Sequence, residues 1–518
     1  MRQRRRLALA VLPPALVLAV LFAVLDAHAR PGGGESYSGG GGGGGGGYGG
    51  GGGSSGGNGA FGALLLFIFS ELPWPLKLLI IGGVVMVYAV NRARTARMQD
   101  WSSGGAGNWV IRRPGLVSSL PQPPPGGSAF SARRQLEELR RFDPEFSVAL
   151  FEDFLYALYA HVEYARAGRA ERLSAYLAPD VLARLRAVRV AEVHTVIVGA
   201  VSFTGVRGLD GGEGQVEVDV EIESNVATVA APTQPERTSY RRERWTLGRR
   251  KDARSRPPAR ARILACPGCG APLDAVVEGT CTHCKRLVSS GDFDWVVRAA
   301  EVAEEQERGP MLTTEVPEQG NDLPTVFDPD VKARYAALSR KDPFFQWPAF
   351  EARVGLVFQE FQAAWTQRDL LKMRPYFTDA LFDTQRYWVE AYRAQGLRNV
   401  TDRARIERLE LARVASDRWF DALTVRIRAT GMDYVVRDQD QKVVRGSTGR
   451  ERRYTEYWTF LRGAARAAPT HTAPECPSCG APLAVGMAGD CRYCRATVTT
   501  GEFDWVLSRI EQDDAYRG

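Results

Sequence analysis

Eight cysteines are the residues of this 518-residue chain whose type and spacing most clearly predict chemistry. They form two sets with the same pattern, C-x2-C-x11-C-x2-C, and the second set follows the first at a constant offset of 210 residues. Paired cysteines on tight turns can place four thiolates at the corners of a tetrahedron, which is the geometry that Zn²⁺ accepts. The sequence therefore predicts two zinc ions, held by Cys266, Cys269, Cys281 and Cys284 and by Cys476, Cys479, Cys491 and Cys494.

Four thiolates fill the coordination shell of zinc, so we expect both ions to be structural rather than catalytic. The alternative is a pair of disulfides in each set, which an oxidising compartment would favour. His283 lies inside the first set, but Tyr493 occupies the matching position in the second, so the histidine is not expected to be a ligand.

Each cysteine set is predicted to form a zinc ribbon with a following short helix, over residues 263–300 and 474–512. The stretches "GDFDWVV" and "GEFDWVL" end the ribbons, and their aromatic residues are expected to clamp each ribbon onto the domain before it. Such a ribbon has too little core to fold alone, so the metal would supply its stability.

The N-terminal part of the chain predicts membrane targeting. Residues 1–29 combine arginines, an apolar run and the small-residue signal "AHA", which indicates a signal peptide or an uncleaved anchor. The glycine-rich residues 30–60 predict a flexible tether, and the apolar residues 61–91 predict a transmembrane region. Arginines open the juxtamembrane linker 92–130, which places the rest of the chain in the cytoplasm. A reducing cytoplasm favours thiolate–metal ligation over disulfides.

A longer segment precedes each ribbon and is also repeated, over residues 131–250 and 331–463, with a linker at 301–330. Apolar residues recur at helical spacing near the start of each copy, at Phe151, Leu155, Leu158 and Val162 and at Phe350, Val354, Phe358, Phe361 and Trp365. Strand patterns follow, such as "QVEVDVEIES", with Val216, Val218, Val220 and Ile222 facing inward and Glu217, Asp219, Glu221 and Glu223 outward. Helices followed by antiparallel strands predict an α+β fold.

The second copy carries "LLKMRPYFTDALFD", "AQGLRN", "DALTVRIRATGMDYVV" and "TEYWTFLR". These stretches resemble the domain named for mitochondrial import inner-membrane translocase subunit 44, over Asp342–Arg462 and more loosely over Asp143–Arg249. The first copy lacks "AQGLRN" and the hairpin after "MDYVV". The resemblance implies nuclear-transport-factor-2-like cones, in which helices pack on a curved antiparallel sheet around an apolar pocket. It also implies a bacterial inner-membrane protein that contacts membranes or protein chains without performing chemistry.

Residues 237–262 hold eleven basic side chains against two acidic ones, in a chain whose formal net charge is only +7. Beside an anionic leaflet, this run predicts lipid binding by Arg241, Arg242, Arg249, Arg250, Lys251 and Arg254. The alternative is a solvated linker.

No nucleophile motif, phosphate loop or metal-hydrolase signature is present, so no catalytic residues are predicted. We expect a non-enzymatic binding module for an apolar or peptide ligand, a partner protein or anionic lipid. Two alternatives are a zinc-ribbon protein that binds nucleic acid and a cone-fold enzyme. We do not expect nucleic acid as a partner of a protein held at a membrane. The enzyme would need an inward-facing carboxyl group with a raised pKa.

Overall fold

The computed structural model describes residues 128–210, 214–261, 263–307, 321–466, 468–513, 516 and 518, which belong to one compact unit. The expected signal peptide or anchor, the glycine tether, the transmembrane region and nearly all of the juxtamembrane linker lie outside the described residues. Among the helices of the described part, none combines the length and the apolar character that crossing a membrane requires.

The first repeat is a set of helices followed by a four-stranded antiparallel sheet of order β1-β2-β3-β6. Its elements are α4 (Ser128–Glu137), η2 (Glu138–Arg141), α5 (Val148–Ala165), η3 (Ala170–Leu173), α6 (Pro179–Ala187), β1 (Glu192–Arg207), β2 (Gln215–Val229), β3 (Arg237–Arg250), α7 (Pro258–Ala261), η4 (Leu273–Ala275), β4 (Val276–Val277), β5 (Thr280–Cys281) and β6 (Val296–Glu307). The predicted α+β class is confirmed for this part of the chain.

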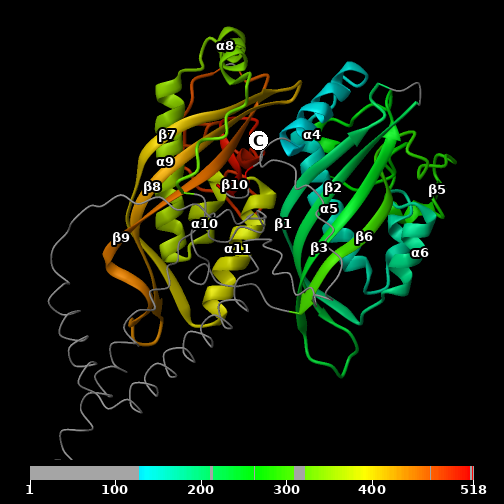
Figure 1. Ribbon diagram of the computed structural model, residues 1–518, viewed down its shortest axis with the longest axis horizontal. Coiled ribbons are helices and arrows are strands. Elements are labelled where there is room, and N and C mark those ends of the chain that lie inside the picture. The colour runs from blue at the N-terminus through cyan, green and yellow to red at the C-terminus, as the bar shows by residue number, and fades with distance from the viewer. Residues whose placement is uncertain are drawn as a thin grey trace, which may run out of the picture. The chain divides into compact units, whose positions relative to one another are not determined.

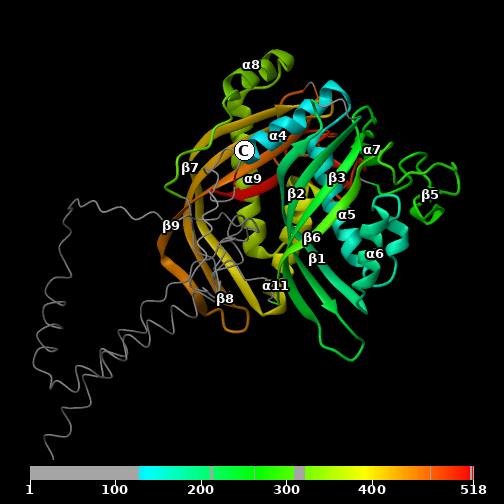
Figure 2. The same cartoon turned by 45° about the vertical axis from the view of Figure 1, so that its right-hand side comes forward.

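The second repeat has the same plan, with the sheet order β7-β8-β9-β10. Its elements are α8 (Val331–Lys341), α9 (Trp347–Gln367), α10 (Leu370–Met373), η6 (Arg374–Tyr376), α11 (Asp379–Ala394), β7 (Leu397–Ser416), β8 (Phe420–Arg437), β9 (Val443–Gly463), η7 (Val498–Thr500) and β10 (Val506–Gln512). Register shifts interrupt the β7–β8 and β8–β9 ladders, and such bulges bend strands. Figures 1 and 2 show these long strands curving around α9.

Hydrophobic periodicity predicts the main helices and the central strand of the first repeat correctly. The apolar positions named above for α5 and α9 are all buried, and so are the four inward residues of β2. Glu223 is an exception, because this residue, which was expected to face solvent, is buried opposite Arg242 of β3. Buried and more exposed residues alternate along the first half of β2, but from Glu223 to Ala227 all residues are buried, because this part of the sheet is covered on both faces.

The segment after each ribbon is a strand, so the expected helix is wrong. β6 pairs with β3, and β10 pairs with β9, in each case completing the sheet. The acidic side chains of β6 lie beside the basic side chains of β3, with Glu304 contacting Arg242 at 2.8 Å and Glu307 contacting Arg237 at 3.2 Å. This charge match and the open backbone edge of β3 outweigh the helix propensity of the alanines and glutamates in the segment.

Each ribbon is therefore inserted into its domain between the third and fourth strands of the sheet. The linker expected at 301–330 begins seven residues too early, because β6 continues to Glu307. The expected aromatic clamp is present, since Trp295 and Trp505 are almost fully buried. Parallel bridges from Leu177 to Val297 and from Phe377 to Leu507 fix the returning strands to the helical layer.

A buried ion pair recurs at the same place in both repeats. In the first, Arg249 of β3 donates to Asp143 at 2.7 Å, and its guanidinium lies 4.9 Å from the ring of Trp295. The matching residues of the second repeat are Arg462, Asp342 and Trp505. In each repeat, the tryptophan after the ribbon thus covers an ion pair. This pair joins the third strand of the sheet, β3 or β9, to the segment just before the long helix, α5 or α9.

Candidate functional site

The four thiols of each cysteine set converge, and none of the eight is in a disulfide. Within each set, the sulfur atoms lie within 4.8 Å of one another. Cys266 and Cys284 are 3.9 Å apart, as are Cys269 and Cys281 and, in the second set, Cys476 and Cys494. A tetrahedral zinc ion with bonds of about 2.3 Å requires sulfur–sulfur edges of about 3.8 Å. Both sets could hold a metal ion, and their donors fit zinc.

Tight backbone turns create this geometry. The amide of Gly270 donates to the carbonyl of Cys266 at 2.7 Å, and the amide of Lys285 donates to that of Cys281 at 2.8 Å. Both donors have positive φ, 80° for Gly270 and 61° for Lys285, a conformation that is unfavourable for the lysine. Gly480 and Arg495 repeat these turns in the second set, with φ of 73° and 66°.

Backbone amides at these turns also favour the thiolate form. The pKa of the Cys281 thiol is lowered to about 6, because the backbone N–H groups of Cys284 and His283 donate to its sulfur. The Ala496 amide lowers the pKa of Cys494 to about 6 in the same way. Burial acts in the opposite direction on Cys266, raising its thiol pKa to about 12. Metal binding requires every ligand to be deprotonated, so a bound cation would offset that cost.

His283 and Tyr493 are exposed and lie outside both converging sets, as the comparison of the two ribbons predicted.

The basic run is not a free surface, because its first half is the strand β3. Arg241 is buried and donates to Glu163 at 2.8 Å, and Arg249 is buried in the ion pair with Asp143. Lipid headgroups could not reach either guanidinium without breaking these contacts, so the lipid-binding role expected of Arg241 and Arg249 is wrong. Ion pairing across the strands explains why the sequence concentrates arginine here.

The other four residues of the predicted lipid site have mixed environments. Arg242 pairs with Glu304, and Lys251 donates to the carbonyl of Leu209 at 3.2 Å. Arg250 and Arg254 are exposed. Lipid binding by these residues stays a prediction.

Contacts between the two repeats form a second candidate site. Arg413 of β7 donates to Glu137 of α4 at 2.7 Å, and Trp419 donates through Nε1 to the carbonyl of Glu145 at 2.9 Å. Apolar packing adds Leu150 of the first repeat to a buried cluster of the second, formed by Phe420, Leu461 and Val506. Buried ion pairs and apolar contacts together fix the two repeats against each other.

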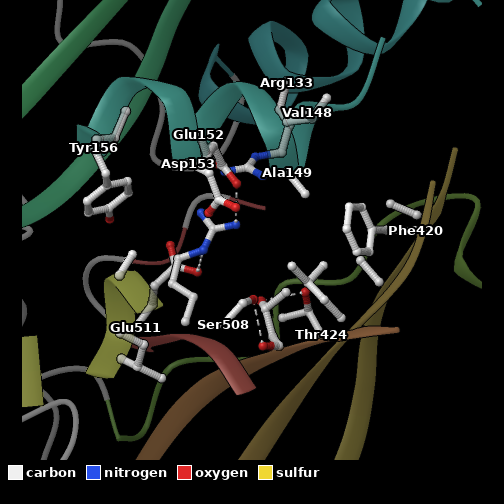
Figure 3. A pocket seen from close by; sticks show the side chains of 18 of the residues that line it. Arg133, Val148, Ala149, Glu152, Asp153, Tyr156, Phe420, Thr424, Ser508 and Glu511 are labelled. Atoms are coloured by element: carbon white, nitrogen blue, oxygen red, sulfur yellow. Dashed lines mark hydrogen bonds and ion pairs between the residues drawn. The ribbon is translucent and has the colours of Figure 1, made fainter. Parts of the chain in front are cut away.

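Two cavities open along this contact. One has a volume of about 130 Å³ and the other about 240 Å³, and both are lined by Asp153 and Tyr156 of α5 and by Ala380 and Thr384 of α11. We call the two together the cleft. In Figure 3, Glu152, Asp153 and Tyr156 of α5 face Thr424 of β8 and Ser508 of β10.

An ion-pair chain crosses the cleft. Glu152 accepts from Arg133 of its own repeat and from Arg509 of the second at 3.2 Å, and Arg509 also lies 3.6 Å from Glu511. The two guanidinium charges lower the pKa of Glu152, although burial acts in the opposite direction. Charged groups from both repeats are therefore held in fixed positions at one end of the cleft.

Nothing in the sequence patterns predicts this site. Glu152 aligns with Glu351 in the repeat, but Glu351 is exposed, so comparing the copies does not single out Glu152. Its partner Arg509 lies 357 residues further along the chain. Tyr376, Trp365 and Trp458 are aromatic residues of a kind more often found in the core than in a pocket, and all three are buried in the core.

Comparison with known proteins agrees with part of the predicted resemblance. Residues 331–472 match the family model of the Tim44-like domain. A search of curated proteins gave no match. One solved structure, described as "Ntf2 like protein involved in plasmid conjugation", is similar over 70% of this chain and 92% of its own, at 9% identity and a TM-score of 0.17. The second repeat is thus similar to Tim44-like domains, as predicted, while the kinship of the first repeat to that family stays a prediction.

Proposed function

We propose that this chain is a non-enzymatic binding protein of the bacterial inner membrane, anchored by residues 61–91, whose two repeats hold a segment of a partner polypeptide in the cleft. The observation that carries the proposal is the cleft itself, which both repeats line and whose charged and hydroxyl groups lie next to apolar side chains. Such a mixture of apolar walls and a few fixed polar groups is typical of ligand sites.

In this proposal each repeat is a nuclear-transport-factor-2-like cone stapled by zinc, and the first is a diverged relative of the second. The shared element order and the recurring ion pair under a tryptophan support that kinship. Zinc in each ribbon would hold the returning fourth strand in register. The two repeats would then present one rigid cleft, with little ordering cost on binding.

Two carboxyl groups with raised pKa, Glu243 and Asp417, are held by hydrogen bonds within structural elements, which supports a non-enzymatic role. Burial raises the pKa of Glu243, but its oxygens accept from Tyr159 at 3.0 Å and from Trp245 at 2.9 Å. The second repeat has the same contact between Trp458 and Glu456, at 2.8 Å. A group that recurs in this way and is satisfied by hydrogen bonds is a structural element of the core.

Asp417 lines the cleft, and burial raises its pKa as well. Its Oδ1 accepts from the backbone amides of Trp419 and Phe420, each at 2.7 Å. These bonds hold the turn between β7 and β8, and they leave this oxygen poorly placed to act as a general base.

Selection from a random peptide library tests the proposal. The purified full chain should enrich peptides, and Ala149→Phe, which places a ring in the cleft, should abolish the enrichment. Val188→Phe is the matched control, because Val188 is exposed and does not line the cleft. Zinc content and unfolding curves show whether each variant is folded. Equal enrichment by wild type and Ala149→Phe would refute the cleft as the binding site.

A further inference from the structure

The cleft is acidic, although the whole chain is basic, with a formal net charge of +7. Its lining holds four guanidinium groups and seven carboxyl groups, an excess of three negative charges. The cations are Arg133, Arg140, Arg413 and Arg509, and the acids are Glu137, Glu152, Asp153, Asp379, Asp383, Asp417 and Glu511.

The four arginines are already engaged by protein acceptors. Glu152 binds Arg133 and Arg509, Glu137 binds Arg413, and Arg140 donates to the carbonyl of Ser416 at 2.9 Å. A ligand carboxylate would therefore have to displace existing partners, in a site that already carries excess negative charge. The charge of the lining favours a cation.

Three of the aspartates, Asp153, Asp379 and Asp383, line the second cavity, which α5 and α11 border. Asp379 pairs with Arg374, and Asp383 lies 3.2 Å from Arg386; neither arginine lines the cleft. Burial raises the pKa of Asp383, against the effect of Arg386, and the negative charge of Asp379 adds to the rise. A cation bound in this cavity would act in the opposite direction and stabilise the carboxylates.

A second, independent observation points to a hydrogen-bond donor as the ligand. Gln385 of α11 lines the cleft and is only 3% exposed, and its Oε1 is buried without a hydrogen-bond partner among the described residues. Leaving a buried acceptor unpaired costs about 1–3 kcal/mol. An ammonium or guanidinium group carries several N–H donors and could satisfy this oxygen.

We propose that the cleft binds the basic side chain of a partner polypeptide, a lysine or an arginine, between Asp153 of α5 and the amide oxygen of Gln385, which line the same cavity. This inference rests on the proposed function, since it names the chemistry of the ligand that the cleft would hold. Tyr156 lies between the two cavities, where its ring could pack along the aliphatic part of such a side chain.

Two labelled peptides of equal length test the inference on the full chain, one alternating lysine with serine and the other glutamate with serine. The lysine peptide should bind, weaken as salt rises, and lose about tenfold or more in affinity with Gln385→Leu or Asp153→Asn. Gln359→Leu is the matched control, because Gln359 is exposed and its amide donates to the carbonyl of Ala404 outside the cleft. If Gln385→Leu misfolds, Asp153→Asn alone decides the matter.

Several outcomes would overturn the inference. The first is tighter binding of the glutamate peptide than of the lysine peptide. The second is binding of neither peptide, which would mean that the cleft holds water only. The third is an unchanged affinity of the lysine peptide for the folded cleft variants. Library peptides that lack lysine and arginine but are lost with Ala149→Phe would leave the cleft as a binding site and refute only its preference for cations.

Discussion

Removing one partner of the buried pair Asp143–Arg249 should destabilise the first repeat strongly. Asp143 is fully buried and accepts from Arg249 at 2.7 Å and from the hydroxyl and amide of Ser255 at 2.6 and 3.0 Å. Asp143→Leu would leave the guanidinium buried between Phe146 and Trp295 without a counter-charge. Breaking a buried pair in this way costs about 3–5 kcal/mol.

The double variant should lose much less stability than the two single variants together. Arg249→Met alone leaves a buried carboxylate and should also cost about 3–5 kcal/mol. With both charges replaced, Ser255 and the half-buried amide of Glu145 lose a partner, at about 1–3 kcal/mol in total. The coupling between the two sites is therefore expected to be about 3 kcal/mol or more.

Urea unfolding followed by tryptophan fluorescence measures these differences, because Trp295 lies over the pair. Asp252→Leu is the control: Asp252 pairs with Arg250 at 2.8 Å on the surface, and its loss should leave the midpoint unchanged. If the single variants have no effect, or their effects add in the double variant, the ion pair does not link β3 to the helical layer.

The remaining predictions concern metal, pH and lipid. The purified chain should carry two zinc ions; Cys479→Ser should reduce this to one and lower hydrogen-exchange protection in β10, and a zinc content near zero would contradict the assignment. Burial acts to raise the pKa of Glu137, but the charges of Arg413 and Arg334 outweigh burial, and the pKa is lowered. The stabilisation by Glu137 is thus fully present above its unfolded pKa of about 4.3 and is lost as the pH falls through the folded pKa. Glu137→Gln should therefore make the free energy of unfolding depend less on pH in this range. Replacing the exposed Arg250 and Arg254 by serine should weaken binding to anionic vesicles, and equal binding would mean that the run does not contact lipid.

Local patterns predicted the parts of this structure that local forces determine. The spacing of Phe350, Val354 and Phe358 predicts α9, and the cysteine spacing predicts both converging thiol sets, because these features depend on neighbours within one element. The predictions for the last element of each repeat are wrong because that element depends on a partner far away in the sequence. Alanine and glutamate favour a helix after Trp295, but the open edge of β3 was a partner that only the folded sheet reveals.

Long-range pairing also explains the errors in the predicted lipid site. Arg241 looks like a solvated basic residue in the sequence, and its partner Glu163 lies 78 residues away in a helix. The cleft escaped prediction entirely, because Glu152 and Arg509 have no significance until the two repeats meet. Gln385 is similar, since nothing in its sequence context marks a buried amide with an unpaired oxygen.

The insertion of each ribbon before the last strand affects the order of events at the ribosome. At roughly 5–20 residues per second, synthesis from the end of β3 at Arg250 to the end of β6 at Glu307 takes about 3–11 s. During that interval the nascent sheet has an open edge, and β3 presents a row of arginines there, which discourages pairing with the wrong chain. The acidic β6 then covers and neutralises this row only after all four cysteines of the first set have emerged, so the first ribbon can fold before the sheet is complete.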